Sequence, residues 1–402
     1  MKNAKDILTS HKKFHINLGL ERISKIMEIL GNPQEKYKII HIAGTNGKGS
    51  TSKIINEILV KANKKTGLFT SPHLFEYEER IKINNQNISK TLFNKLINKI
   101  DSLAKENSIE LSEFELINAT AFYYFYIMQV EYVVLEVGLG GLFDSTNIIK
   151  KPLIEVITTI DFDHTERLGS SIEEIALQKA GIIKDNSKVV ISKENKGFEI
   201  VKNYAKEKHA KILYPKTIET IFENNKNYAI LNNQKVPFNL LGKHQGQNLA
   251  LAIEAIKNLD FEVDNSILKN ALNEVKWNFR LEYIQEKNIL IDGAHNPNGI
   301  KILRNFLDEH FKNNKKTFIF GCLKNKNYSE MLDILLKEED EFYFYEFNYP
   351  NALKFNELDT KYQARKISST KEIETIINEN KNLKIFCGSL YMLGNIFKEI
   401  EL

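Results

Sequence analysis

Hydrophobic residues in the first half of the chain alternate between short continuous runs and a helical spacing. The continuous runs predict β-strands at 38–43, 66–70, 132–137, 153–160 and 188–192. Between the first two runs, apolar residues recur with the period of an amphipathic helix over 50–62, at Ile54, Ile55, Ile58, Leu59 and Ala62. Strands that alternate with helices indicate βαβ units, so we expect a largely parallel sheet between about residues 20 and 205.

The pattern changes in segment 209–243, which predicts a small β insertion. Within it, YAILNNQKVPF at 228–238 is typical of a hairpin that turns at Asn232 and Asn233. A long helix is expected to start near Asn248. A second alternating series follows it, with strands near 288–291, 316–320, 341–346 and 383–387 and helices near 298–311, 328–337 and 389–400.

The chain length of 402 residues exceeds what one hydrophobic core usually fills, so we expect two α/β domains. The first, over 1–281, carries the mostly parallel sheet and the β insertion, and the second, over 282–402, is smaller and Rossmann-like. Apolar residues make up 42% and charged residues 27%, as in soluble globular proteins. The sequence shows neither a membrane-spanning apolar run nor a secretory signal, which predicts a cytoplasmic protein without a membrane partner.

Cysteine usage and charge narrow the chemistry further. Cys322 and Cys387 are the only cysteines, which argues against a disulfide framework and against a thiolate metal cluster. A bound metal ion would therefore need oxygen and imidazole ligands. The net charge of +4 is spread along mixed runs, and no basic stripe is interleaved with aromatic residues, so a nucleic-acid partner is not expected.

The segment GTNGKGS at 44–50 joins a strand to an amphipathic helix and has the features of a phosphate-binding loop. Its three glycines, whose N–H groups can approach an anion closely, are Gly44, Gly47 and Gly49. The helix N-terminus favours negative charge, Lys48 adds a point charge, and Ser50 offers a hydroxyl to Mg²⁺. The spacing is shorter than GxxxxGK[ST], yet the strand–loop–helix context favours phosphate binding over a turn without a ligand.

Polar residues follow several predicted strands, where ligands of open α/β sheets bind. They are Ser71, His73, Glu136, Asp161, Asp163 and His164. Such oxygen and imidazole groups beside a triphosphate would suit a hard cation. Taken singly, Glu136 could equally belong to a buried hydrogen-bond network, and His164 could equally be a satisfied core histidine.

Two further segments allow either a structural or a functional interpretation. Lys179 falls on the apolar stripe of the predicted helix 172–183, where its stem could extend past the core or its amine could serve a site. In the second domain, DGAHNP at 292–297 follows the strand NILI. Its residues Asp292, His295 and Asn296 could face a ligand or could form a capped turn.

With these residues in place, the chain resembles the Mur ligase superfamily and, within it, the folylpolyglutamate synthase/dihydrofolate synthase family. The similar motifs run through nearly the whole chain in order. They are LGLERI at 18–23, HIAGTNGKGS at 41–50, TSPHL at 70–74, LEVGLGG at 135–141, DSTN at 144–147, DHTERLG at 163–169, QKAGIIK at 178–184, GKHQGQN at 242–248, DGAHNP at 292–297 and GSLY at 388–391.

The resemblance implies an ATP- and Mg²⁺-binding domain of the P-loop type, followed by a ligase domain. The ATP-binding loop would comprise Gly44, Thr45, Asn46, Gly47, Lys48, Gly49 and Ser50. Ligands of Mg²⁺ would be Ser50, Ser71, Glu136 and His164, with Lys179 holding a second Mg²⁺ as a carbamate. From the far side of the cleft, Asn248, Arg280 and Asp292 would contact the nucleotide, with His295 near the reacting phosphate.

The same resemblance places a pterin-bearing substrate near Leu18, Gly19 and Leu20, near Ser112, Glu113, Phe114 and Glu115, and near Leu142, Phe143 and Asp144. Three positions depart from the family pattern. Leu142 stands where the family usually has Arg, and Gln178 stands where Glu usually precedes the lysine. WNFR at 277–280 replaces W-P-G-R, so Arg280 aligns while the turn before it differs.

The expected activity is ATP-dependent amide ligation of L-glutamate to dihydropteroate, to reduced folates or to both, through an acyl phosphate. The expected partners are these small molecules, and the expected oligomeric state is a monomer. A cell-wall Mur ligase that acts on a UDP-muramyl substrate is the alternative enzyme. A regulatory protein that hydrolyses ATP without ligation is a second alternative, against which the carboxylate and imidazole groups beyond the phosphate loop argue.

Overall fold

The computed structural model describes residues 2–11 and 19–401. Contacts within the chain define two compact units, one of Met1–Ile218 with Gly246–Val275 and one of Glu219–Gln245 with Lys276–Leu402. Mixed α/β structure in both units confirms the predicted fold class. The domain ranges 1–281 and 282–402 stay a prediction. In the described part of the chain, no helix is both long and apolar enough to cross a membrane.

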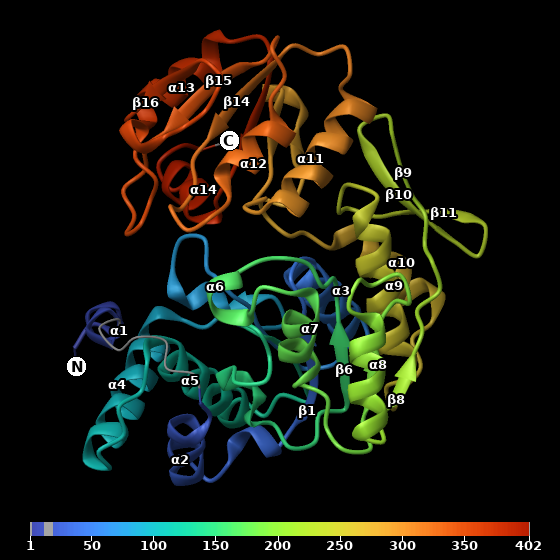
Figure 1. The fold of residues 1–402 in the computed structure, drawn as a ribbon. Helices are drawn as coiled ribbons and strands as arrows, with labels where there is room; N and C mark the ends of the chain where they lie inside the picture. The colour runs from blue at the N-terminus through green and yellow to red at the C-terminus, as the bar shows by residue number, and fades with distance from the viewer. Residues whose placement is uncertain (1, 12–18, 402) are drawn as a thin grey trace. The chain divides into compact units, whose positions relative to one another are not determined.

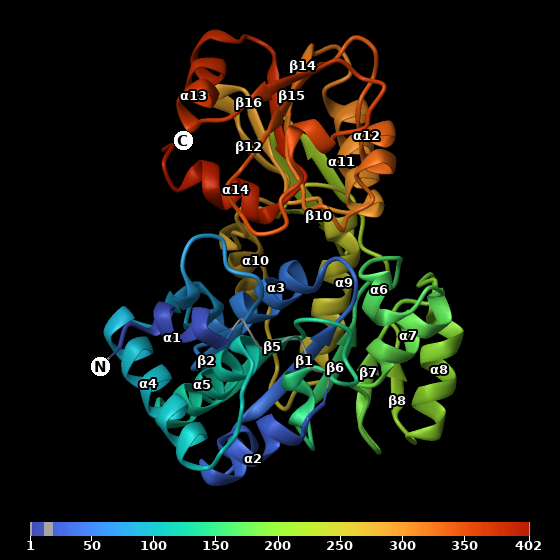
Figure 2. The ribbon, with the colours of Figure 1, turned by 60° about the vertical axis from the view of Figure 1, so that its left-hand side comes forward.

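The first unit contains an eight-stranded sheet with the order β4-β3-β2-β5-β1-β6-β7-β8 (Figure 2). Its strands are β1 Lys38–Ala43, β2 Thr66–Phe69, β3 Ile81–Ile83, β4 Gln86–Asn87, β5 Tyr132–Glu136, β6 Ile154–Ile157, β7 Lys188–Val190 and β8 Lys211–Leu213. All neighbours pair in parallel except β3 and β4, which add an antiparallel edge. The five strands predicted for this region are therefore confirmed, with β6 and β7 shorter than expected.

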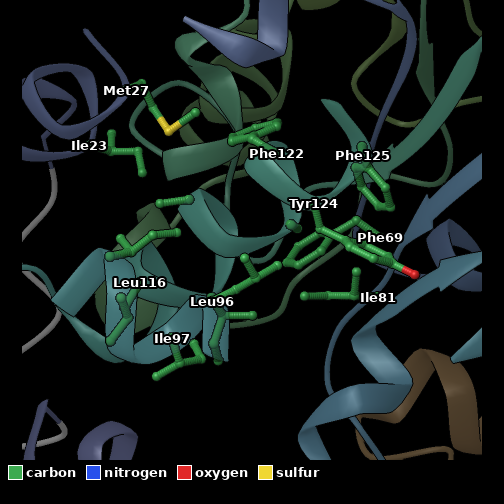
Figure 3. Packing of buried hydrophobic residues seen from close by; sticks show 14 of the residues in the cluster. Ile23, Met27, Phe69, Ile81, Leu96, Ile97, Leu116, Phe122, Tyr124 and Phe125 are labelled. Atoms are coloured by element: carbon green, nitrogen blue, oxygen red, sulfur yellow. The ribbon is translucent and has the colours of Figure 1, made fainter. Parts of the chain in front are cut away.

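The hydrophobic runs become strands because helices bury both faces of the sheet, as parallel sheets require. The helices of this unit are α1 Ala4–His11, α2 Glu21–Ile29, α3 Lys48–Lys61, α4 Lys90–Glu106, α5 Glu113–Ile127, α6 Thr165–Leu168, α7 Ile172–Ala180, α8 Phe198–Glu207, α10 Asn265–Glu274 and most of α9 His244–Lys257. Against β2 and β3, α4 and α5 bury one core that includes Phe69, Leu96 and Phe122 (Figure 3). A second core joins β6 and β7 to α7 and α8.

The predicted hairpin belongs to a separate three-stranded antiparallel sheet (Figure 1). Its strands are β9 Thr220–Glu223, β10 Lys226–Leu231 and β11 Gln234–Pro237. Asn232 and Asn233 both have positive φ, 48° and 62°, as the two-residue turn between right-twisted strands requires. The hairpin is thus confirmed, whereas β8, also inside segment 209–243, extends the large sheet instead.

The second unit holds a six-stranded sheet with the order β12-β13-β17-β14-β15-β16. Its strands are β12 Glu282–Ile284, β13 Ile289–Ile291, β14 Lys316–Phe320, β15 Glu341–Tyr345, β16 Ala364–Ile367 and β17 Leu383–Cys387. Helices α11 Pro297–His310 and α12 Tyr328–Leu335 cover one face, and α13 Thr370–Glu379 and α14 Leu390–Phe397 cover the other (Figure 2). Apart from β12, which is antiparallel, the sheet is parallel, as the alternating pattern predicts.

Candidate nucleotide and acceptor-substrate site

The phosphate loop connects β1 to α3 and needs glycine at two positions. Gly47 caps α3 with a φ of 87°, and Gly44 has a φ of 152°. A Cβ atom on Gly44 would lie 1.8 Å from Thr158 Oγ1, and one on Gly47 would lie 2.4 Å from Asn248 Oδ1. The loop is therefore packed against the end of β6 on one side and against α9 on the other.

Hydrogen bonds from the end of β6 fix the shape of this loop. The backbone N–H groups of Thr45 and Asn46 donate to the carbonyl oxygen and the hydroxyl oxygen of Thr159, at 2.6 and 3.1 Å. The Lys48 ammonium donates to the carbonyl oxygens of Gly44 and Thr45, at 2.9 and 3.2 Å. A positive charge and a helix N-terminus thus lie together at the carboxyl edge of the sheet, which is the arrangement that binds phosphate.

Replacing Gly44 with alanine is expected to destabilise the protein and weaken nucleotide binding. The new Cβ atom adds crowding worth about 1–3 kcal/mol. The backbone conformation adds a strain of about 1–3 kcal/mol. Gly31→Ala is the matched control, because Gly31 also has positive φ, 79°, but its Cβ atom would meet nothing within 4 Å. Denaturant unfolding should show a larger loss in the free energy of unfolding for Gly44→Ala than for Gly31→Ala. ADP titration should show weaker ADP binding for Gly44→Ala and unchanged ADP binding for Gly31→Ala.

Two of the predicted metal ligands lie together at the carboxyl ends of neighbouring strands. Glu136 ends β5 and is buried, and its Oε2 atom accepts the backbone N–H of Ser71, which follows β2, at 3.3 Å. Ser50 is buried in the first turn of α3. Among the described residues no group of three His, Cys, Asp or Glu side chains could hold a metal ion. Hydroxyls and one carboxylate nevertheless fit Mg²⁺, which usually completes its shell with substrate phosphates and water.

His164 lies in the left-handed region, with a φ of 50°, at the start of α6. Its two ring nitrogens lie 3.9 Å from Asp163 Oδ2 and 3.8 Å from Glu166 Oε1, which exceeds hydrogen-bond distance. About a third of its side chain is exposed, so the structure does not make it a core histidine. The structural alternative for His164 is therefore the weaker one.

The structure buries Lys179 in α7, as the apolar stripe predicts. Burial is the main reason that its pKa is lowered to about 7, and the positive charge of Lys48 adds to the effect, while Asp163 opposes it. The backbone of Lys179 lies beside the loop that follows β5, since a Cβ atom on Gly141 would lie 3.2 Å from Lys179 Cα. Lys179 is thus a buried amine that is partly neutral near pH 7.

The segment 112–115, assigned by resemblance to the acceptor substrate, begins α5 with a capping box between Ser112 and Glu115. Arg22 on α2 also pairs with the Glu115 carboxylate, at 3.2 Å for each of two contacts. Glu113 accepts a hydrogen bond from the Tyr77 hydroxyl at 2.7 Å, and the ring of Phe114 lies 6.1 Å from that of Phe69. Glu115 therefore has a structural task as well as its predicted one.

The other predicted acceptor residues lie before α2 and after β5. Gly19 and Leu20 directly precede α2, while Leu18 lies outside the described residues. Leu142 and Phe143 line a surface pocket of about 360 Å³, together with Leu20, Lys184, Tyr204 and Lys208 among others. The backbone of Leu142 packs so closely on Gly181 that a Cβ atom there would lie 2.6 Å from Leu142 Cα. Where the family usually has an arginine, this chain therefore has an apolar side chain, in a pocket that Lys184 and Lys208 also line.

Asp144 is buried and is engaged by its own loop. Its carboxylate accepts the backbone N–H groups of Leu139 and Thr146, both at 2.9 Å, and the Thr146 hydroxyl at 2.6 Å. A hydrogen bond from the Gly138 backbone is a fourth contact. Burial raises the pKa of Asp144 above its usual range, and these donors oppose that shift. The carboxylate thus holds the loop in shape through these hydrogen bonds.

The second unit presents the predicted nucleotide residues of segment 280–295. Asp292 follows β13 and accepts the N–H groups of Leu281 and Ala294, both at 2.8 Å. Burial raises its pKa, and the Arg280 charge opposes this. Nδ1 of His295 lies 2.9 Å from the Gly293 carbonyl oxygen. Asn296 caps α11 by accepting the Gly299 N–H, so the structural interpretation holds for this residue.

Sequence reasoning missed several residues that shape the loops. Thr158 and Thr159 hold Asn46, and Lys196 donates to both carboxylate oxygens of Asp161 at 2.8 Å. The two threonines stand at the end of the run IEVITTI, so their position beside the phosphate loop was a usable signal. Lys196 lies in a loop of mixed charge, and no pattern distinguishes it there.

Comparison with known proteins places this geometry in context. A model of the Mur ligase middle domain matches residues 42–256, and a model of the dihydrofolate synthetase C-terminal domain matches residues 278–399. A dihydrofolate synthase/folylpolyglutamate synthase of Bacillus subtilis is 33% identical over 99% of this chain and 99% of its own.

Solved structures agree with the sequence matches. The folylpolyglutamate synthase of Mycobacterium tuberculosis, complexed with ADP and AMPPCP, superposes with a TM-score of 0.86 at 26% identity, covering 98% of this chain and 96% of that one. The bifunctional folylpolyglutamate synthase/dihydrofolate synthase of Yersinia pestis, complexed with AMPPNP and Mn, gives 0.85 at 25% identity, covering 100% and 99%.

Proposed function

Because the chain belongs to the folylpolyglutamate synthase/dihydrofolate synthase family of the Mur ligase superfamily, we propose that it adds L-glutamate to dihydropteroate and to reduced folates. The chain is an ATP-dependent ligase that uses a divalent cation. One observation supports the proposal most: the phosphate loop and Glu136 lie at one carboxyl edge of a parallel sheet, and Lys179 is buried beside the loop that follows β5.

The reaction needs activation because a carboxylate is a poor acyl donor. An oxygen of the acceptor carboxylate attacks the γ-phosphorus of ATP, ADP leaves, and an acyl phosphate forms. The glutamate amine then attacks the carbonyl carbon, phosphate leaves, and the amine loses its proton as the amide forms. Such phosphoryl transfer depends mainly on positioning and charge neutralisation, which a preformed loop at a helix N-terminus can supply.

The residue roles that we propose are those that the family resemblance implies. The phosphate loop and Lys48 are assigned to the ATP phosphates. Asn248 packs on Gly47 and is assigned to the nucleotide. Ser50, Ser71, Glu136 and His164 are assigned to Mg²⁺, which when bound neutralises phosphate charge. In the second unit, Arg280 and Asp292 are assigned to the nucleotide and His295 to the reacting phosphate. We also expect the enzyme to act as a monomer in the cytoplasm.

Dihydropteroate with L-glutamate and Mg²⁺-ATP is expected to cause ADP release, and a reduced folate is expected to do the same. The reason is that a relative named dihydrofolate synthase/folylpolyglutamate synthase matches 99% of this chain, whose segments assigned to the acceptor are held by capping bonds and by Arg22. Coupled ADP release with each acceptor measures both activities. If only the reduced folate is turned over, the proposed dihydrofolate synthase activity is wrong. If only a UDP-muramyl substrate is turned over, the chain is a cell-wall Mur ligase instead.

A further inference from the structure

The buried ring of His41 begins a hydrogen-bond chain that ends on Asp144. β1 places the ring on the sheet face of its register partners Leu135 and Glu155. Nε2 of His41 lies 3.0 Å from Thr146 Oγ1, which lies 2.6 Å from Asp144 Oδ1. A carboxylate only accepts, so the Thr146 hydroxyl donates to Asp144 and accepts the N–H of His41 Nε2.

Packing alone does not explain a histidine at this position. The ring is fully buried, and its Nδ1 atom has no hydrogen-bond partner among the residues that the structure describes. Burial, with the charge of Lys184 as a smaller cause, lowers the pKa of His41 to about 3, so the ring is neutral. A buried unpaired acceptor destabilises a fold, and an aliphatic residue would avoid it. The N–H donated to Thr146 is what the histidine adds.

The segment 138–147, which we call the acceptor loop, contains Thr146 and is hydrogen-bonded to α7. The N–H of Leu142 donates to the Gln178 carbonyl at 2.7 Å, directly before Lys179 in α7. The side-chain amide of Asn147 donates to the Leu142 carbonyl at 2.9 Å. The acceptor loop is therefore attached to α7 through Leu142 and is held to itself through Asp144. Its contact with β1 is made by His41.

We propose that His41 is a positioning residue for the acceptor substrate, which it serves through Thr146 and Asp144 without touching the substrate. The proposal rests on the proposed function, because that function assigns the acceptor loop to the pterin-bearing substrate. Loss of the His41 contact lets the loop shift and weakens acceptor binding. The phosphate loop is fixed separately by Thr158 and Thr159, so ATP binding is unaffected.

Steady-state kinetics of four variants test this role. His41→Leu and Thr146→Val remove the contact and are expected to raise the KM for dihydropteroate about tenfold, the effect of losing one good hydrogen bond. The KM for ATP should stay within about twofold, since its loop keeps its contacts. His41→Gln and Thr146→Ser keep a donor and a hydroxyl, so both should remain near the wild type. The double variant His41→Leu/Thr146→Val should be no worse than Thr146→Val, because Thr146→Val already removes the hydroxyl that His41 contacts, together with its bond to Asp144.

The proposal is overturned if His41→Gln behaves like His41→Leu, or if the KM values for both substrates rise together. If His41→Leu does not fold, the comparison of Thr146→Val with Thr146→Ser decides. If the wild type turns over neither dihydropteroate nor a reduced folate, the proposed function fails by itself. Hydrogen exchange of the Leu139 and Thr146 amides then tests His41, and unchanged exchange in His41→Leu overturns the role.

Discussion

Lys48→Ala is expected to lower kcat/KM for ligation by about a thousandfold, the range typical of removing one preorganised charge from a phosphoryl-transfer site. The Lys48 ammonium donates to two carbonyl oxygens of the loop, those of Gly44 and Thr45, at 2.9 and 3.2 Å. Its loss leaves the strand and helix on either side intact. The free energy of unfolding of the variant, measured in denaturant, should therefore lie within about 1 kcal/mol of the wild-type value.

Lys61→Ala is the matched control, because Lys61 ends the same helix and pairs with Glu274 on α10. Both variants lose one lysine from α3, so they change its net charge equally. The control should keep nearly full activity, because Lys61 lies at the other end of the helix from the phosphate loop. It should also keep its stability, because a partly exposed ion pair contributes little to the free energy of unfolding. If Lys48→Ala keeps most of its activity at saturating ATP, the assignment of this loop to the phosphates is wrong.

The order of strands and helices could be predicted where hydrophobic runs are buried on both faces. Every residue of β5 and of β14 is buried, and both strands were predicted within one residue of their ends. The exposed edge strand β16, with the sequence ARKI, has no apolar run and was missed. The helix α13, although amphipathic, lies in the same polar stretch and was also missed. Where side chains face water, the pattern carries no strand signal.

The candidate site could be predicted in part, where its residues form a local pattern along the chain. A glycine-rich loop and a lysine on an apolar stripe can be recognised in the sequence, and the charge of Lys48 contributes to lowering the pKa of Lys179. The task of Asp144 was not visible, because its donors Leu139 and Thr146 offer backbone groups that every residue has. The contact of His41 with Thr146 joins residues 105 positions apart, and neither residue type marks it.

Lys179 is predicted to carry a carbamate in the active enzyme, which would bind a second Mg²⁺ through its oxygens. CO₂ adds to a neutral amine, forming the N–C bond with release of one proton. Burial lowers the pKa of Lys179 to about 7, so much of the amine is neutral at physiological pH. The anionic product would be unstable when buried unless a cation lay close, and the proposed Mg²⁺ ligands Glu136 and His164 would supply that cation.

Three measurements follow from this chemistry. Removal of CO₂ and bicarbonate should lower activity, with recovery when bicarbonate is returned. Because protonated amine dominates below the pKa, the dependence on bicarbonate should become steeper as pH falls below about 7. Lys179→Ala should lose at least about a hundredfold in kcat, as expected when a group that binds a catalytic metal is removed. Short carboxylates such as acetate should restore part of it.

The rescued variant is also the control for the CO₂ effect. Lys179→Ala with acetate has no amine to modify, so its activity should not respond to bicarbonate, whereas the wild type should. A carbamate carbon signal from ¹³C-bicarbonate, present in the wild type and absent in Lys179→Ala, reports the modification without reference to activity. An unmodified Lys179 in a structure with nucleotide and two metal ions, or wild-type activity indifferent to bicarbonate, would leave it as a buried neutral lysine that acts beside Lys48.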